Sequence, residues 1–233
     1  MVAKIKEGQD AVLYVVPTPI GNLEDITLRA LRVLREVDVV LAEDTRTTGN
    51  LLRHYDIKTR LLPFHLHNEH AVVDRYGQLL AEGTSIALVS DAGTPGISDP
   101  GFLLVREAIG LGVKVTCLPG ATALVPAVVG SGFSCESFMY EGFLPVKKGR
   151  RTRLLNVAQS EKTVIVYESP HRLIRLLLEM REIMGEERRV CVVREISKVY
   201  ESYVRGSIGE VLEELGRTER RGECVVVVEG KSR

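Results

Sequence analysis

Two segments of the chain combine glycine, proline and small polar residues directly after short apolar runs. The first, residues 17–23, reads PTPIGNL, and the second, residues 90–101, reads SDAGTPGISDPG. Glycine lets backbone N–H and C=O groups approach a ligand closely, and the aspartates of the second segment favour a cationic or amino-bearing ligand over a free phosphate. We therefore predict a site for a zwitterionic or nucleoside-like ligand, with a purely structural turn as the alternative for each segment.

A third segment, residues 118–123, reads LPGATA and also follows an apolar run. Its small side chains would let the chain approach a flat ligand, and a packing role explains them equally well. The first segment lacks the G-x-G-x-x-G spacing, which argues against a dinucleotide-binding site.

Charged residues follow other apolar runs. Asp44 and Arg46 come after residues 39–42. At the carboxyl end of a strand they would face a ligand, and Asp44 could equally cap the next helix within a surface ion pair. Glu195 and Lys198 follow residues 189–194, where they could reach the same cleft or form an ion-paired edge.

The histidine-rich segment HLHNEH, residues 65–70, matches no common zinc spacing. We therefore expect no metal here and assign His67, Asn68 and Glu69 to substrate binding. Helix capping is an alternative for Asn68.

The second half of the chain holds two further candidates. Residues 147–153, KKGRRTR, form a basic run that would suit backbone phosphates, although such runs are commonly solvated helix faces. Glu168, His171 and Arg172 follow an apolar run, and Arg172 suits phosphate or carboxylate recognition. His171 could be a base or only a surface residue in the first turn of a helix.

Short apolar runs alternate with segments of helical periodicity along the whole chain. Strands are predicted at residues 11–16, 39–42, 86–90, 113–118, 138–142, 163–167, 189–194 and 223–228, and helices at 26–37, 48–55, 68–81, 102–111, 121–130, 148–159, 170–184 and 208–215. We expect Asp25 to cap the first helix. The alternation predicts an α/β fold with mixed sheets covered by helices, in an N-terminal domain, residues 1–130, and a C-terminal domain, residues 131–233.

Composition narrows the functional classes. Thirty-one Lys and Arg residues balance 31 Asp and Glu residues, so any nucleic-acid contact must come from a local basic patch. The four cysteines are widely spaced, which indicates reduced thiols rather than disulfides. The longest apolar run near the N-terminus is residues 11–16, far below the roughly 20 residues that span a bilayer. We therefore expect a soluble, cytoplasmic protein without membrane association.

Nine motifs in order resemble those of one family. They are VPTPIGNLEDIT, AEDTR, HNE, ALVSDAGTPGISDPG, LPG, YEGFLP, YESPHRL, REISK and RGE. The pattern resembles the ribosomal RNA small-subunit methyltransferase I family, which belongs to the tetrapyrrole-methylase-like, class III methyltransferases. The resemblance runs over residues 13–229, and SDAGTPGISDPG and ESPHR are its most specific parts.

The resemblance implies two α/β domains with S-adenosylmethionine in the cleft between them, and a homodimer. It implies methyl transfer to the ribose 2′-hydroxyl of a decoding-centre cytidine in 16S rRNA, within the small ribosomal subunit. Carried onto this chain, it assigns cofactor binding to Pro17, Thr18, Pro19, Gly21, Asn22, Ser90, Asp91, Ala92, Gly93, Thr94, Pro95, Ser98, Asp99, Gly120 and Ala121. It places the RNA near Lys147, Lys148, Arg150 and Arg151 and near the ESPHR motif.

Methyl transfer from a sulfonium needs alignment and a group that accepts or orients the hydroxyl proton. Our hypothesis is that Asp44, Glu168 or Glu195 accepts this proton. Arg46, His171, Arg172 or Lys198 would then hold the adjoining phosphate. The motivation is that all of them follow predicted strands, and the sequence does not rank them.

Three other functions remain open. A tetrapyrrole (precorrin-type) methyltransferase of the same fold, or a relative that methylates a protein or an amine, would not need the basic run or the HNE and ESPHR motifs. A non-catalytic RNA-binding factor for ribosome assembly would not bind S-adenosylmethionine.

Overall fold

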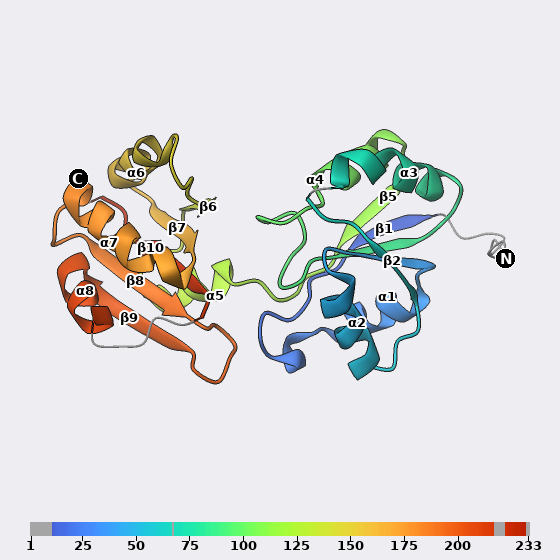
Figure 1. Cartoon of the computed structure of the whole chain (residues 1–233), viewed down its shortest axis with the longest axis horizontal. Coiled ribbons are helices and arrows are strands. Elements are labelled where there is room, and N and C mark those ends of the chain that lie inside the picture. Colours follow the sequence, from blue (N-terminus) through green and yellow to red (C-terminus); the bar gives the residue numbers. More distant parts are fainter. Residues whose placement is uncertain (1–10, 67, 217–221, 232–233) are drawn as a thin grey trace. The chain divides into compact units, whose positions relative to one another are not determined.

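The computed structural model describes residues 11–66, 68–216 and 222–231. The chain divides into two compact units, Met1–Thr122 and Ala123–Arg233. Each unit contains a five-stranded sheet with helices packed against it (Figure 1). Among the described residues, no helix is long and apolar enough to cross a membrane.

The sheet of the first unit is parallel throughout, in the order β3-β2-β4-β1-β5. Its strands are β1 (Val12–Val15), β2 (Val39–Ala42), β3 (Arg60–Pro63), β4 (Ile86–Val89) and β5 (Lys114–Cys117). Its helices are η1 (Leu23–Asp25), α1 (Leu28–Glu36), α2 (Thr45–His54), α3 (Glu69–Ala81) and α4 (Phe102–Gly110). Two apolar clusters, one rich in residues of α1 and the other in residues of α3 and α4, bury β2 and β4.

Parallel strands bring their carboxyl ends to one edge of a sheet. The segments that follow β1, β4 and β5 therefore start at the same edge. They are residues 17–23, 90–101 and 118–123, which we name loops 1, 2 and 3.

The sheet of the second unit is mixed, in the order β6-β7-β10-β8-β9. Its strands are β6 (Phe138–Phe143), β7 (Thr163–Glu168), β8 (Arg189–Arg194), β9 (Ser202–Ser207) and β10 (Cys224–Val228). Among the strands that the structure describes in this unit, only β6 and β7 pair in parallel. The helices are α5 (Leu124–Ser131), α6 (Arg150–Gln159), α7 (Pro170–Met184) and α8 (Ile208–Gly216), and the largest core cluster joins α6, α7 and α8 to one sheet face.

The predicted α/β fold is confirmed, with three local differences. Helix α5, predicted in the N-terminal domain, belongs to the second unit because it packs against β10 and β8. The first helix is capped by Thr27 rather than Asp25, since the Thr27 side chain accepts a hydrogen bond from the Ala30 amide at 3.0 Å. Strands β3 and β9 were not predicted, because neither forms a run of buried apolar residues.

Candidate functional site

Loops 1, 2 and 3 are tied to one another by hydrogen bonds. Thr18 and Gly93 exchange backbone hydrogen bonds of 2.9 Å in both directions. The buried Thr18 hydroxyl donates to the carbonyl of Ser90 at 3.0 Å. The Thr94 hydroxyl donates to the carbonyl of Ala121 at 3.2 Å. The three glycine- and proline-rich segments therefore meet at one edge of the sheet.

Glycine is required at two points of this arrangement. A Cβ at Gly120 would lie 2.7 Å from Cβ of Pro17, so only glycine lets loops 1 and 3 touch in this way. Gly93 has φ +80°, a conformation that other residues rarely adopt. These glycines thus allow the backbones of the loops to approach one another closely.

The Glu69 carboxylate fixes the far end of loop 2. Its Oε1 accepts hydrogen bonds from the amides of Gly101 at 3.0 Å and Leu103 at 3.2 Å, and the residue is 7% exposed. A carboxylate at a helix N-terminus satisfies free amides and complements the helix dipole. Glu69, predicted to bind substrate, is therefore a buried cap for α4.

The neighbouring residues of the same motif also have local partners. The Asn68 side chain accepts a hydrogen bond from the His65 amide at 2.8 Å. Asn68 precedes α3 in the capping position, but its side chain makes no cap hydrogen bond to that helix. His67 lies outside the described residues, so its assignment to substrate stays a prediction.

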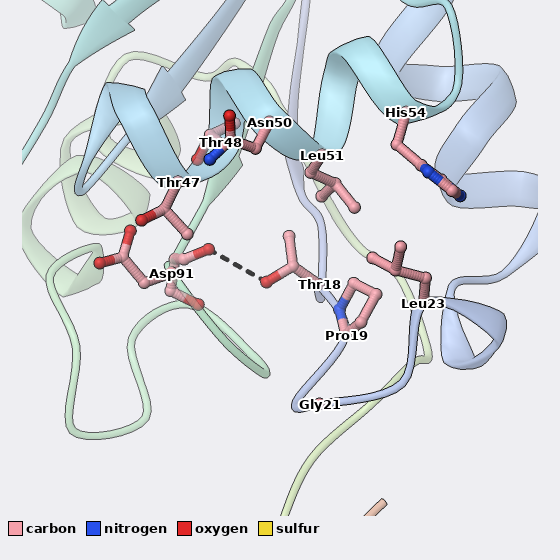
Figure 2. A pocket seen from close by; sticks show the side chains of 11 residues that line it. Thr18, Pro19, Gly21, Leu23, Thr47, Thr48, Asn50, Leu51, His54 and Asp91 are labelled. Carbon is pink, nitrogen blue, oxygen red and sulfur yellow. Dashed lines mark hydrogen bonds between the residues drawn. The ribbon is translucent and has the colours of Figure 1, made fainter. Parts of the chain in front are cut away.

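A pocket of about 470 Å³ opens between loop 1, helix α2 and the start of loop 2. Figure 2 shows Thr47 and Asp91 at one end, and Leu23, Leu51 and His54 at the other. Its lining residues are Thr18, Pro19, Gly21, Leu23, Thr47, Thr48, Asn50, Leu51, His54, Ser90 and Asp91. This volume lies within the range typical of small-molecule sites.

Five of the predicted cofactor residues line this pocket, but sequence reasoning missed the contribution of α2. Thr47, Asn50, Leu51 and His54 have the spacing i, i+3, i+4 and i+7, which places them on one face of a helix. The predicted helix began at Thr48, whereas α2 begins at Thr45. The helical spacing was the signal that could have identified this wall.

One buried hydroxyl in the wall points to a ligand. Thr48 is 2% exposed, and its Oγ1 has no hydrogen-bond partner among the described residues. A buried polar atom without a partner costs free energy, so native proteins rarely leave one. Together with apolar Leu23 and Leu51 and the Asp91 carboxylate, it suits a ligand that has a flat ring, hydroxyls and a positive charge. S-adenosylmethionine has all three.

Carboxylates give this edge of the sheet a strong negative character. Burial, together with the charges of Glu43 and Asp91, raises the pKa of Asp99 to about 7. Burial also raises the pKa of Glu43 and the pKa of Asp91. A nearby cation would relieve this repulsion. No group of three His, Cys, Asp or Glu residues in the described part of the chain is placed to hold a metal ion.

Asp44 has a different environment from these three carboxylates. It caps α2, where it accepts a hydrogen bond from the Arg46 amide at 2.8 Å, and it pairs with the Arg46 guanidinium at 2.6 Å. The hydrogen bond from the Arg46 side chain lowers the pKa of Asp44 to about 2. Its own amide donates to Asp91 at 3.0 Å, so the Asp44 turn also orients a pocket residue.

In the second unit, Glu168 and Arg150 are buried against each other. Glu168 is 1% exposed and contacts Arg172 at 2.7 Å and Arg150 at 3.5 Å. Arg150 also pairs with Glu179 at 2.6 Å. Both side chains are enclosed in an ion-pair network, and the roles predicted for them, Glu168 as a proton acceptor and Arg150 as an RNA contact, stay predictions.

Residues of the Glu195 motif are also held by ion pairs, which reach Glu223 on a second segment of the chain. Lys198 contacts Glu195 at 2.9 Å and Glu223 at 3.3 Å, and Glu195 also accepts a hydrogen bond from the Glu223 amide at 2.9 Å. Partial burial acts the other way, but the hydrogen bonds from Lys198 and the Glu223 amide lower the pKa of Glu195. Of the two alternatives for this motif, the ion-paired edge matches these contacts.

The remaining predicted residues are at the surface or at the loops. His171 is exposed in the first turn of α7, and Arg172 is held by Glu168. Lys147, Lys148 and Arg151 are exposed. Several predicted cofactor residues belong to the three loops but do not line the pocket: Pro17, Asn22, Ala92, Gly93, Thr94, Pro95, Ser98, Asp99, Gly120 and Ala121.

Comparisons with known proteins agree with the fold. The family of tetrapyrrole (corrin/porphyrin) methylases matches residues 12–212. Ribosomal RNA small subunit methyltransferase I of Pseudomonas aeruginosa is 48% identical over 221 residues, which cover 94% of this chain and 78% of the relative. The protein of the same name from Escherichia coli O157:H7 is 48% identical over 227 residues, covering 96% and 79%.

A solved structure shows the same fold at low sequence identity. Uroporphyrin-III-C-methyltransferase from Thermus thermophilus superposes with a TM-score of 0.64 at 22% identity, over 94% of each chain. The chain therefore belongs to the tetrapyrrole methylases, a family that takes its methyl group from S-adenosylmethionine, and within them to the ribosomal RNA small subunit methyltransferase I proteins.

Proposed function

We propose that this chain transfers a methyl group from S-adenosylmethionine to the ribose 2′-hydroxyl of a decoding-centre cytidine in 16S rRNA. The relatives' names support the RNA, and the resemblance of the motifs supports the position. The observation that carries the proposal is a nucleoside-sized pocket, lined by loop 1, α2 and the start of loop 2, beside carboxylates. We further propose that the reaction takes place in the bacterial cytoplasm, on the small ribosomal subunit, and that the enzyme is a homodimer.

The first unit offers the groups that would hold the cofactor. Leu23 and Leu51 would contact the adenine ring, and the Thr48 hydroxyl would gain a partner. The negative cluster of Asp91, Asp99 and Glu43 would attract the amino group and the sulfonium. Whether the second unit closes over the cofactor, as the predicted cleft between the domains requires, stays a prediction.

When bound, S-adenosylmethionine supplies a methyl group that is already activated by the positive sulfur. The ribose oxygen would take this methyl group in exchange for its proton, which would pass to solvent, and S-adenosylhomocysteine would remain. The chain's task is therefore alignment of the hydroxyl, with the carboxylates holding the cation in place.

The three carboxylates predicted to accept the proton are poorly suited to do so. Asp44 pairs with Arg46 and Glu195 with Lys198, while Glu168 is enclosed between Arg150 and Arg172. A carboxylate whose pKa is lowered, as in Asp44 and Glu195, is a weak base. These ion pairs favour structural roles for all three residues, as caps and links between segments.

The exposed cations of the second unit are the best candidates for the RNA backbone. Lys147, Lys148 and Arg151 lie at the start of α6, next to a pocket of about 300 Å³. Because the chain has no net charge, such a local patch must provide the attraction to phosphates. This patch supports RNA over a small tetrapyrrole as the substrate.

Methyl transfer to small ribosomal subunits that lack the modification tests the proposal. The subunits are incubated with the protein and methyl-labelled cofactor, and the rRNA is digested and mapped by mass spectrometry. The expected result is one added methyl on a decoding-centre cytidine ribose. Asp91→Asn should reduce the transfer, while Asp56→Asn, an exposed aspartate away from the pocket, should not.

Two results would contradict the proposal. Transfer to uroporphyrinogen but not to rRNA would assign the chain to the tetrapyrrole branch of the family. Binding to the subunit without any binding of S-adenosylmethionine in a calorimetric titration would identify an assembly factor instead.

A further inference from the structure

Three aromatic rings form a cluster at the carboxyl end of β6 and β7 in the second unit. The ring of Tyr167 lies 5.1 Å from that of Tyr140 and 5.6 Å from that of Phe143, both in edge-on contacts. Phe143 is 52% exposed, and the two tyrosines are partly exposed. We name Tyr140, Phe143 and Tyr167 the aromatic platform.

A β-bulge brings these rings together. Tyr140 is paired with Ile165 and Phe143 with Tyr167, while the register shifts between Tyr140 and Gly142. In a regular strand, residues three apart point to opposite faces. The extra residue restores Tyr140 and Phe143 to the same face, and Gly142 adopts the φ of +62° that the bulge requires. Bulges commonly re-aim side chains next to functional sites.

The platform lies on the sheet face opposite the main core. Val164 and Val166 of β7 point into the cluster covered by α6, α7 and α8, so Tyr167 points to the other face. Helix α5 packs on that face, chiefly over β10 and β8. Strand β6 is at the sheet edge, two positions away from β10.

Two lysines follow the platform in the sequence, in the turn between β6 and α6. Lys147 and Lys148 are exposed and come four and five residues after Phe143. Aromatic rings beside cations are the chemistry with which proteins hold single-stranded nucleic acid, through base stacking and phosphate contacts. The adenine of S-adenosylmethionine also has a flat ring, but that ligand carries a sulfonium and no phosphate, so lysines would not favour it.

We propose that the aromatic platform stacks against an unpaired nucleobase of the RNA substrate, while Lys147 and Lys148 hold the adjoining phosphates. The platform is a positioning surface for RNA on the second unit. The identity of the RNA as rRNA rests on the proposed function, whereas the stacking does not depend on methyl transfer.

A tryptophan placed in the platform reports stacking directly. The chain has no tryptophan, so Phe143→Trp introduces a single fluorophore. Phe138→Trp is the matched control, because Phe138 is 39% exposed at the opposite end of β6. A single-stranded RNA oligonucleotide should quench the fluorescence at position 143 and leave position 138 unchanged. An abasic oligonucleotide of the same length should not quench.

Three outcomes would contradict the proposed stacking of RNA bases on the platform. They are no quenching at position 143, equal quenching by the abasic oligonucleotide, and quenching by S-adenosylhomocysteine in place of RNA. The last outcome would assign the rings to the adenine of the cofactor.

Kinetics with small subunits provide the second test. Phe143→Leu should raise the KM for the subunit about tenfold, since base stacking on an aromatic side chain is lost, and should leave the Kd for S-adenosylmethionine unchanged. Phe143→Tyr should restore the KM, and Phe138→Leu should have no effect. An unchanged KM in Phe143→Leu would contradict the proposal. If the unmodified protein transfers no methyl group, the proposed function is wrong. The stacking proposal would still be decided by the fluorescence test.

Discussion

Asp99 titrates near neutral pH because it is partly buried beside Glu43 and Asp91. Its pKa of about 7 lies above the ordinary value of 3.8, so the fold favours the neutral carboxyl. The protonated Asp99 carboxyl therefore contributes to the free energy of unfolding. This contribution is fully present below about pH 4 and is lost as the pH rises through 7. A cationic ligand favours the ionised form instead, so its affinity should rise over the same pH range.

Asp99→Asn separates these two effects. At pH 8 the variant without ligand should melt about 2–4 °C higher than the unmodified protein, which corresponds to about 1 kcal/mol, because the buried charge is gone. Its affinity for S-adenosylmethionine should be lower and should no longer change between pH 6 and 8. Scanning calorimetry and titration calorimetry at both pH values measure this. A pH dependence that persists in the variant would show that another group is responsible.

Arg150 illustrates a charged residue whose main role is structural. Arg150→Ala should destabilise the protein by about 3 kcal/mol in urea unfolding, because it leaves the buried Glu168 with one partner fewer. Arg151→Ala is the matched control, since the Arg151–Glu182 pair is exposed and should contribute less than about 1 kcal/mol. Equal losses in both variants would contradict the structural role of the buried network.

At the scale of elements, we expect cofactor binding to depend on the contact between loops 1 and 3. Gly120→Ala should weaken binding of S-adenosylmethionine about tenfold, because its Cβ would lie 2.7 Å from Pro17 and push loops 1 and 3 apart. Gly110→Ala is the control, because that position has no atom within 4 Å of an added Cβ. Titration calorimetry decides the matter, and an unaltered Kd in Gly120→Ala would mean that the contact between these loops is not needed.

The sequence predicted the three loops well and the ion-pair networks poorly. Alternating apolar runs and helical segments indicate parallel strands, and parallel strands place the segments after them at one edge. Glu168 and Arg150 were harder, because charged residues are expected at the surface unless a partner is known. The second partner of Arg150, Glu179, lies on α7, and no local sequence pattern joins these two residues.

The elements that the sequence did not predict also lack a distinctive local pattern. Strands β3 and β9 are edge strands whose side chains are largely half-exposed, so neither gives an apolar run. The pocket face of α2 mixes threonine, asparagine, leucine and histidine, which resembles an ordinary surface helix. Only the position of α2 after β2 makes this face part of a site.

At the scale of the whole molecule, the chain has no net charge, so the effect of salt on RNA binding depends on the phosphates that a local basic patch contacts. If Lys147, Lys148 and Arg151 contact three phosphates, the logarithm of the affinity should fall with the logarithm of salt with a slope of about −2 for single-stranded RNA. Replacing both lysines with alanine should reduce the steepness by about 1.4, which leaves a slope of about −0.7. Replacing the exposed Lys114 and Lys162 should leave the slope unchanged, and equal effects of the two double variants would disprove a local patch.

The joining of loops 1, 2 and 3 into one binding site for S-adenosylmethionine is the claim on which the proposed function depends. A crystal structure with S-adenosylhomocysteine tests it most directly. The prediction is that the ligand contacts at least two of the three loops, with its amino group near Asp91 or Asp99. A ligand bound away from all three loops would contradict the claim.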